Sequence, residues 1–143
     1  SSDVTMDVAV GPDASGVLYA LGGASGGLSL FMDRGRLVYE YNMMIIERYV
    51  ARSENALMAG KHRIEVATTL ASAKPLAPAE VVLTVDGQEV ARTTVGRTVP
   101  AAFSASETFD VGIDLGSPVS LDYYDRAPFE FTGAIGSVNV EMK

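Results

Sequence analysis

Residues 22–42 read GGASGGLSLFMDRGRLVYEYN and carry the pattern of a β-hairpin. Apolar side chains recur at every second position of two arms: Leu28, Leu30 and Met32 in the first, and Leu37, Tyr39 and Tyr41 in the second. This period-2 alternation is typical of a strand with one buried face. Arg34-Gly35 separates the arms, and Gly35 can adopt the positive φ that a tight antiparallel reversal needs. The stretch therefore predicts two paired strands, with Tyr39 and Tyr41 in or near the core.

The glycines of residues 22–27 have the composition of a loop that holds phosphate. A phosphate loop also needs a following Lys-Ser or Lys-Thr and the N-terminus of a helix, and the sequence continues instead into a strand pattern. We therefore expect these glycines to allow a close approach of two backbones or a β-bulge.

Alternation elsewhere predicts strands at residues 4–10, 17–21, 61–71, 129–132 and 135–142, and a short extended piece at 108–111. Residues 80–95 predict a second hairpin, because Asp86-Gly87 lies between two alternating arms and Asp-Gly favours a tight turn. Residues 43–52 predict another strand, although the apolar run at 43–46 would also suit a short buried helix. Residues 53–60, 71–79 and most of 97–118 are expected to be loops.

This pattern of roughly nine or ten short strands, without a convincing amphipathic helix, predicts an all-β fold. The expected architecture is a two-sheet antiparallel β-sandwich of the jelly-roll, concanavalin-like or lectin-like kind. The 143 residues, 48% of them hydrophobic, suit one domain, which we expect to span residues 1–143.

The composition excludes several partners and sites. A net charge of −7 with scattered basic residues argues against nucleic acid, which needs clustered Lys and Arg. The sequence has no Cys, so disulfides and thiolate metal sites are excluded. No apolar run is long enough for a membrane span, and the first residues lack the pattern of a signal peptide, so no membrane partner is expected. The compartment stays open. The Ser-Ser start suggests a domain cut from a longer chain.

The sequence offers little catalytic chemistry, and we predict no catalytic residue. His62 is the only histidine; it begins a predicted strand and is expected to have a structural role at the surface or edge, with a partner contact as the alternative. Acids gather in the last third of the chain, at Glu107, Asp110, Asp114, Asp122, Asp125 and Glu130. Two such carboxylates could serve a glycosidase, but no spacing singles out a pair.

The acid-rich region also predicts two weaker site hypotheses. Asp110 and Asp114, with nearby carbonyls, could supply the oxygen ligands that Ca²⁺ prefers, although turn caps and solvated charge are the favoured explanation. Tyr123, Tyr124 and Phe129 lie close by in sequence and could form an exposed aromatic surface for a glycan, with loop packing as the alternative. Asp110, Asp114, Tyr123 and Tyr124 are therefore the predicted contacts for a glycan or for the mouth of a substrate site.

Several short motifs follow one another in a characteristic order: Gly22-Gly23, Tyr39-Glu40-Tyr41-Asn42, Glu47-Arg48, Gly60-Lys61-His62, Val85-Asp86-Gly87, Arg97-Thr98-Val99-Pro100, Glu107-Thr108-Phe109-Asp110-Val111-Gly112, Gly116-Ser117-Pro118-Val119 and Phe129-Glu130-Phe131-Thr132-Gly133. From about residue 16 to residue 140, this order resembles the C-terminal β-domain of large bacterial arylsulfatases. One departure is Ile45-Ile46, where the family pattern would place Gly first.

The resemblance implies that the chain is the C-terminal fragment of a larger sulfatase whose catalytic domain precedes Ser1. In that family the nucleophile is a formylglycine made within a Cys/Ser-x-Pro-x-Arg signature, beside a divalent metal, and the signature is absent here. The implied role is accessory: packing on the catalytic domain of the same chain and shaping the mouth of its site, through residues 110–119, toward a sulfated or glycan substrate. The segment alone is expected to lack sulfatase activity and a cofactor of its own, the Ca²⁺ hypothesis aside. A lectin-like glycan-binding module and an oligomerisation domain are the alternatives.

Overall fold

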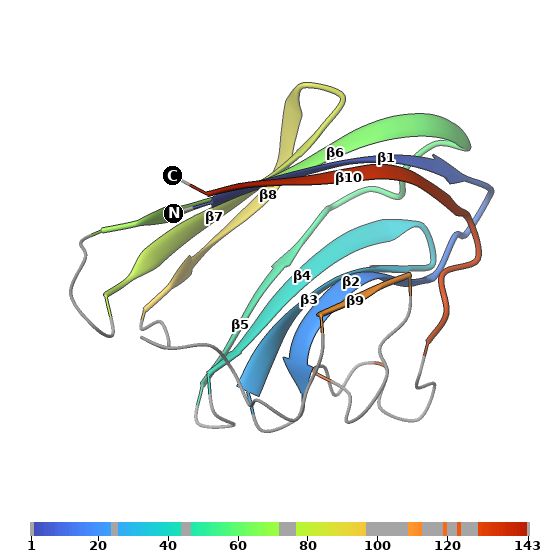
Figure 1. Cartoon of the computed structure of the whole chain (residues 1–143). Coiled ribbons are helices and arrows are strands. Elements are labelled where there is room, and N and C mark those ends of the chain that lie inside the picture. Colours follow the sequence, from blue (N-terminus) through green and yellow to red (C-terminus); the bar gives the residue numbers. More distant parts are fainter. Residues whose placement is uncertain are drawn as a thin grey trace.

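The computed structural model describes residues 2–23, 26–43, 47–71, 77–96, 109–112, 119, 123 and 129–142, and it stacks two five-stranded antiparallel sheets face to face (Figure 1). Sheet A has the order β10 (Ala134–Met142), β1 (Ser2–Val10), β6 (Gly60–Leu70), β7 (Ala79–Val85) and β8 (Gln88–Val95). Sheet B has the order β5 (Glu47–Arg52), β4 (Arg36–Met43), β3 (Gly26–Asp33), β2 (Gly16–Gly23) and β9 (Phe109–Val111). The all-β sandwich expected from the alternation is confirmed.

Both predicted hairpins form with the expected turns. In β3 and β4, Leu30 lies opposite Tyr39, and the connecting Arg34 and Gly35 have φ of 51° and 83°. Asp86 and Gly87 repeat this geometry between β7 and β8, with φ of 51° and 84°. Two successive positive φ values define a type I′ turn, whose twist matches that of the flanking strands. Arg34 and Asp86 therefore hold a left-handed backbone without being glycine.

The Gly-rich segment closes a further hairpin, in which Gly22 lies opposite Gly27. The prediction of a strand at residues 129–132 was wrong. Phe129 has a φ of 50°, and Glu130 forms only an isolated parallel bridge with Val17. The backbone here bonds to different segments in turn, since Phe131 N–H donates to Gly112 O (2.8 Å) and Thr132 N–H to Ser15 O (2.8 Å). A chain that changes partner at each residue cannot extend one ladder. Residues 44–46, where a buried helix was the alternative to a strand, lie outside the described residues.

The main core fills the space between the two sheets. Its most completely buried large side chains come from alternate positions of facing strands: Met6, Leu18, Leu30, Met32, Leu37, Tyr39, Ile64 and Leu83. Tyr39 and Tyr41 are 2% and 8% exposed, as the hairpin pattern predicts. On the opposite, outer face of sheet A, charged and polar side chains such as Arg63, Glu80 and Arg92 remain exposed.

The outer face of sheet B is buried as well, under a second apolar cluster. Phe31 contacts Tyr123 edge-to-face with ring centroids 5.0 Å apart, and Tyr123 stacks on Phe129 at 5.2 Å. Val17, Ala20, Val38 and Val119 complete this cluster. Sheet B is thus a central layer, covered by sheet A on one side and by parts of the segment between β9 and β10 on the other.

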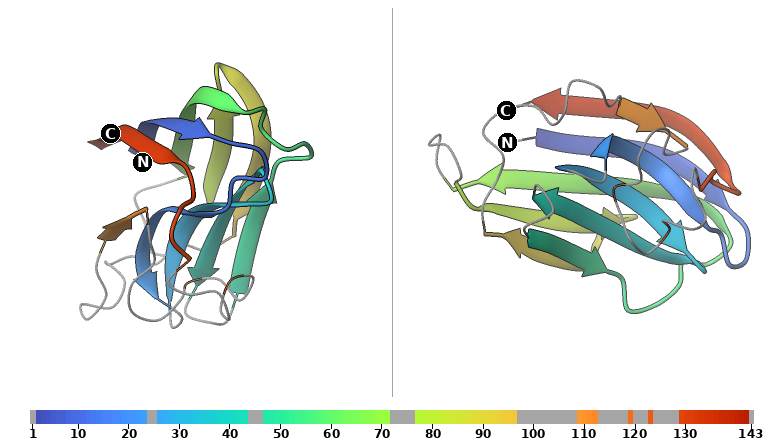
Figure 2. Two further views of the ribbon diagram at one scale, coloured as in Figure 1. Left: turned by 90° about the vertical axis from the view of Figure 1, so that its right-hand side faces the viewer. Right: turned by 90° about the horizontal axis from the view of Figure 1, so that it is seen from below.

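Both ends of the chain lie at one end of the sandwich, where Ser2 pairs with Met142 (Figure 1). The opposite end of the sandwich holds four connections: those between β1 and β2, β3 and β4, β5 and β6, and β7 and β8. This follows because β1 begins beside the chain ends and the strands of each sheet pair in antiparallel fashion. The two further views in Figure 2 show the sheets lying over each other along their length. No long apolar helix of the kind that crosses a membrane occurs in the described part of the chain.

Candidate binding site

Four connections form one end of the sandwich: residues 11–15, the turn at residues 34–35, the loop at residues 53–59 and the turn at residues 86–87. We call this end the turn rim. Loops at the end of a rigid β-scaffold are the usual place for binding side chains, because the scaffold positions them while their sequence is free to vary. The turn rim is therefore the end of the sandwich where a binding site is expected.

Hydrogen bonds between the loops hold the turn rim together. Gly35 N–H donates to Ala14 O (2.8 Å), and Leu57 N–H donates to Gly35 O (2.7 Å). The hydroxyl oxygen of Ser15 accepts a bond from Arg34 N–H at 2.9 Å. A Cβ at position 35 would lie 2.9 Å from the Cβ of Ala56, so the packing as well as the positive φ requires glycine there. Three connections are thus fixed to one another through the Arg34-Gly35 turn.

His62 fastens the fourth connection. Its Nδ1 lies 2.6 Å from Oδ2 of Asp86, in the turn between β7 and β8, and its Nε2 lies 2.6 Å from the carbonyl oxygen of Met58, in the 53–59 loop. The other carboxylate oxygen of Asp86 accepts Arg63 N–H at 2.8 Å. Burial lowers the pKa of His62, but the bonds to Met58 and Asp86 outweigh it and hold the pKa above its ordinary value. The structural role expected for His62 is confirmed.

Two hollows of the turn rim share one wall. The arginine hollow, about 600 Å³, is lined by Asp33, Arg34, Arg36, Arg52, Glu54, Asn55 and Ala56. The loop hollow, about 380 Å³, lies between residues 53–58 and the β7–β8 turn, with Asp86, Gln88 and Glu89 on its far side. Glu54, Asn55 and Ala56 line both hollows. The two hollows therefore form one continuous polar surface along the 53–59 loop.

A third hollow of about 570 Å³ opens over the start of β10 and the adjoining ends of β1 and β6. Ala9, Ala134 and Gly136 are among its small lining residues, and Lys61 is among its charged ones. Asp7 also lines it and pairs with Arg63 (Oδ1 to Nε, 3.6 Å). His62 lines this hollow too, and its ring nitrogens contact Asp86 and Met58 of the loop hollow.

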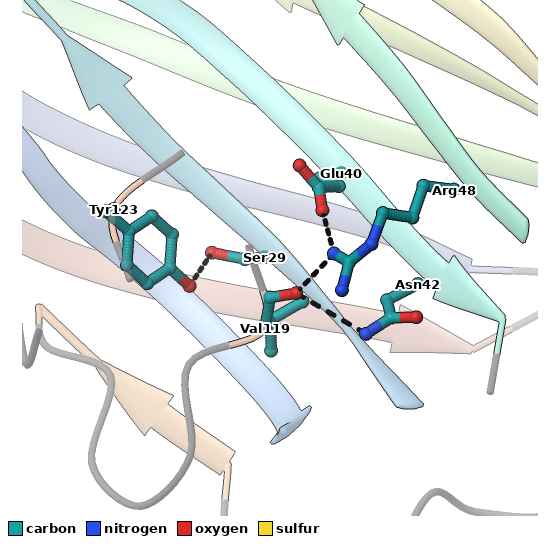
Figure 3. Close-up of polar contacts among 6 residues, drawn as sticks. All are labelled: Ser29, Glu40, Asn42, Arg48, Val119 and Tyr123. Carbon is teal, nitrogen blue, oxygen red and sulfur yellow. Dashed lines mark hydrogen bonds and ion pairs between the residues drawn. The ribbon is translucent and has the colours of Figure 1, made fainter. Parts of the chain in front are cut away.

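A buried polar network lies on the outer face of sheet B (Figure 3). One guanidinium nitrogen of Arg48 lies 2.5 Å from Oε2 of Glu40 and donates to the carbonyl oxygen of Val119 at 2.8 Å. Asn42 Nδ2 lies 3.4 Å from the same carbonyl. Tyr123 donates its hydroxyl proton to Ser29 Oγ at 3.1 Å. These contacts fasten the covering segment onto the sheet, which makes the network structural.

The predicted site residues fall largely elsewhere. Tyr123 is 0% exposed and packs between Phe31 and Phe129, so the prediction that its ring belongs to an exposed aromatic surface was wrong; Phe129 is 8% exposed. The Tyr123 ring instead covers the outer face of sheet B. The backbone of Asp110 pairs with Ala20 in β9, while the Asp110 side chain and all of Asp114 and Tyr124 lie outside the described residues. The Ca²⁺ site at Asp110 and Asp114 stays a prediction.

The arginine hollow was not predicted from the sequence. The signal that could have found it is Asp33-Arg34-Gly35-Arg36, which places an arginine on each side of Gly35 in the predicted tight turn. The sequence alone does not place Arg52 in the arginine hollow, because its position depends on the strand register in which Arg52 lies opposite Val38.

Two antiparallel sheets stacked in this order define a lectin-like, jelly-roll β-sandwich. Neither a protein-family model nor a curated protein matches the chain. The mouse laminin α1 chain, domains LG4-5, matches with a TM-score of 0.66 and 17% identity over 98% of this chain. The LG1-3 region of the laminin α2 chain matches with a TM-score of 0.68 and 16% identity over 97% of this chain. The chain spans 36% and 27% of the lengths of those structures. At such identities the likeness shows the fold.

Proposed function

We propose that the chain is a non-catalytic, lectin-like module that binds a carbohydrate at the turn rim. The observation that carries the proposal is the continuous polar surface along the 53–59 loop, mounted on a lectin-like sandwich. Small-molecule sites are typically preformed concavities with a few placed polar groups. Here the loops are hydrogen-bonded to one another, so little order has to be gained when a ligand binds.

The chemistry of this surface suits a sugar. Asn55 and Gln88 offer both hydrogen-bond donors and acceptors, and Glu54 and Glu89 offer acceptors. Hydroxyl groups of a saccharide both donate and accept, so they can pair with such a mixture without leaving either partner unsatisfied. Leu57, Met58, Val85 and Val90 also line the loop hollow and could contact the apolar C–H face of a sugar ring.

The environment of His62 supports a binding role without catalysis. A general base needs a nitrogen lone pair directed at the reacting group. Both ring nitrogens of His62 instead face acceptors of this chain, Asp86 Oδ2 and Met58 O. The single histidine of the sequence is therefore engaged in holding two connections of the turn rim.

A glycan array with the whole chain tests the proposal, followed by affinity measurements on the best ligand. Asn55→Ala, at the wall shared by both hollows, should weaken binding about tenfold, which is the effect of losing one or two good hydrogen bonds. Asn139→Ala is the matched control, because Asn139 is also an exposed asparagine but lies on β10 outside these hollows. An array without hits, or equal losses from the two variants, would contradict the proposal.

The ordered sequence motifs support a second proposal, that the module is an accessory domain of an arylsulfatase-like hydrolase. Binding a saccharide beside a catalytic domain would be compatible with such a setting. A Cys/Ser-x-Pro-x-Arg signature in the coding sequence upstream of Ser1 would support it, and an upstream sequence from an unrelated enzyme class would refute it. Turnover of an aryl sulfate by the chain alone would contradict the accessory role.

A further inference from the structure

We infer that the arginine hollow binds an oxyanion group, a sulfate or a carboxylate, carried by a short saccharide whose rings lie along the 53–59 loop. This inference rests on the proposed carbohydrate-binding function and names the ligand class of the same surface.

The fold brings the three arginines together. Arg36 and Arg52 both project from the outer face of sheet B, because Arg36 lies two residues before Val38 on β4 and Arg52 lies opposite Val38 on β5. Side chains in this diagonal relation are close enough for both to reach one group. Arg34 joins them from the adjacent turn, where its backbone is held by Ser15.

Ion pairing distinguishes Arg34 and Arg36 from Arg48, Arg63 and Arg92. Arg48, Arg63 and Arg92 each lie within 4.0 Å of a carboxylate. Within the described ranges, neither Arg34 nor Arg36 has an ion pair for its guanidinium. The charged side chains that line the hollow are three arginines and two acids, Asp33 and Glu54, so their formal charges add up to +1. The whole chain, in contrast, has a net charge of −7. A planar guanidinium donates two parallel hydrogen bonds to a sulfate or carboxylate, which makes such arginines suited to an anion.

The surroundings limit how much charge the ligand can bear. Asp86 and Glu89 line the adjoining loop hollow, and the net charge of the chain repels a polyanion. A saccharide with one charged group avoids this repulsion: its anion lies among the arginines, and its neutral hydroxyls reach Asn55 and Gln88. We therefore infer a singly charged oligosaccharide rather than a long, uniformly sulfated chain.

The experiment measures affinity by calorimetry for four probes: a monosulfated disaccharide, its uronic-acid analogue, its uncharged parent and a long sulfated polysaccharide. The wild-type chain should bind one or both of the singly charged disaccharides about ten- to a hundredfold more tightly than the uncharged parent, as expected for hydrogen bonds to a charged group. Comparison of the sulfated and carboxylated probes identifies which oxyanion is preferred. The polysaccharide, compared per disaccharide unit, should bind more weakly than the preferred disaccharide.

The double variant Arg34→Gln/Arg36→Gln should lose the preference for charge and retain the affinity for the uncharged parent. Arg63→Gln is the matched control, because Arg63 is an exposed arginine on the outer face of sheet A, beside Asp7 and outside both hollows, and the variant should keep the preference. Equal melting temperatures of the variants would show that folding is intact. If charged and uncharged probes bind equally, the inference fails while the proposed function stands. If no saccharide binds, both fail. Tighter binding of the polysaccharide would overturn the limit to a single charge.

Discussion

The imidazole of His62 lies between two acceptors, with Nδ1 2.6 Å from the Asp86 carboxylate and Nε2 2.6 Å from the Met58 carbonyl oxygen. A neutral imidazole has one N–H and can satisfy one of them, whereas an imidazolium satisfies both. The protonated ring therefore joins the 53–59 loop to the β7–β8 turn. Protonation of one side chain thus couples two connections of the turn rim.

Stability should fall as the pH rises from slightly acidic to alkaline values. The folded-state pKa of His62 is raised above 6.5, so its contribution is complete below the unfolded pKa and is lost as the pH passes through the folded one. The Arg63 amide, and then His62, lower the pKa of Asp86 below 3.8, so its contribution is lost only as the pH falls through that lower value. The melting temperature should be highest between about pH 4 and pH 6.5.

The variant His62→Gln should flatten the alkaline limb of this profile. Melting temperatures of the wild type and the variant at about pH 5 and pH 8 provide the test, since the histidine titrates between them. Other groups near the ring include Asp7, Lys61, Arg63, Glu54 and Glu89. They remain in the variant, so a pH dependence equal to that of the wild type would show that they, and not His62, cause it.

Removing the guanidinium at position 48 should destabilise the fold strongly. Arg48→Met removes the guanidinium that pairs with the Glu40 carboxylate, whose side chain is 4% exposed. Breaking a buried ion pair by removing one member costs about 3 kcal/mol of unfolding free energy. Urea denaturation measures the loss.

The companion variant at position 40 separates pairing from packing. Glu40→Gln combined with Arg48→Met should cost at least about 1 kcal/mol less than the sum of the two single losses, because the charges depend on each other. Additive losses would show that the pair contributes through packing and not through charge.

Deleting the buried hydroxyl of Tyr123 should have a smaller effect. Tyr123→Phe keeps the ring contacts with Phe31 and Phe129 but removes the donor to Ser29 Oγ. The expected loss is about 1–2 kcal/mol by urea denaturation. Ser29→Ala in the same background should add little, because its partner is already gone. A large additional loss would mean that Ser29 contributes through another contact.

Two glycines with positive φ should respond differently to alanine. At Gly16 a Cβ would lie 2.3 Å from the carbonyl oxygen of Glu130, so Gly16→Ala should cost about 3 kcal/mol or more. At Gly87 a Cβ would meet nothing within 4 Å, and Gly87→Ala should cost only the left-handed backbone strain of about 1–2 kcal/mol. Equal losses in denaturant would show that backbone conformation, and not the contact with Glu130, decides both.

The sheets could be predicted from sequence because the patterns that determine strands and turns lie in short, continuous stretches of the chain. Alternating apolar residues with Arg34-Gly35 or Asp86-Gly87 between them determine both strand pairing and turn type. The same rule assigns Glu40 to a solvent face, since it alternates with Tyr39 and Tyr41. Glu40 is buried and pairs with Arg48, which in turn donates to the carbonyl oxygen of Val119, in a segment about seventy residues further along the chain.

The candidate site was less predictable for the same physical reason. The arginine hollow needs the antiparallel register of β4 and β5 and the return of the 53–59 loop over the Arg34-Gly35 turn. Neither follows from a local pattern. The acid-rich segment has an unusual composition, but two of its described residues, Val119 and Tyr123, take part in covering sheet B.

The pairing of Ser2 with Met142 makes the domain easy to insert into another protein. Two chain ends that are paired across neighbouring antiparallel strands lie about as far apart as the two ends of an ordinary surface loop. A host could therefore accept the whole sandwich in place of a loop, without moving its own strands or helices apart. The turn rim would then point away from the host, at the far end of strands nine residues long. For the same reason, a circular permutant that joins these ends by a short linker and opens the chain at Gly87 should fold.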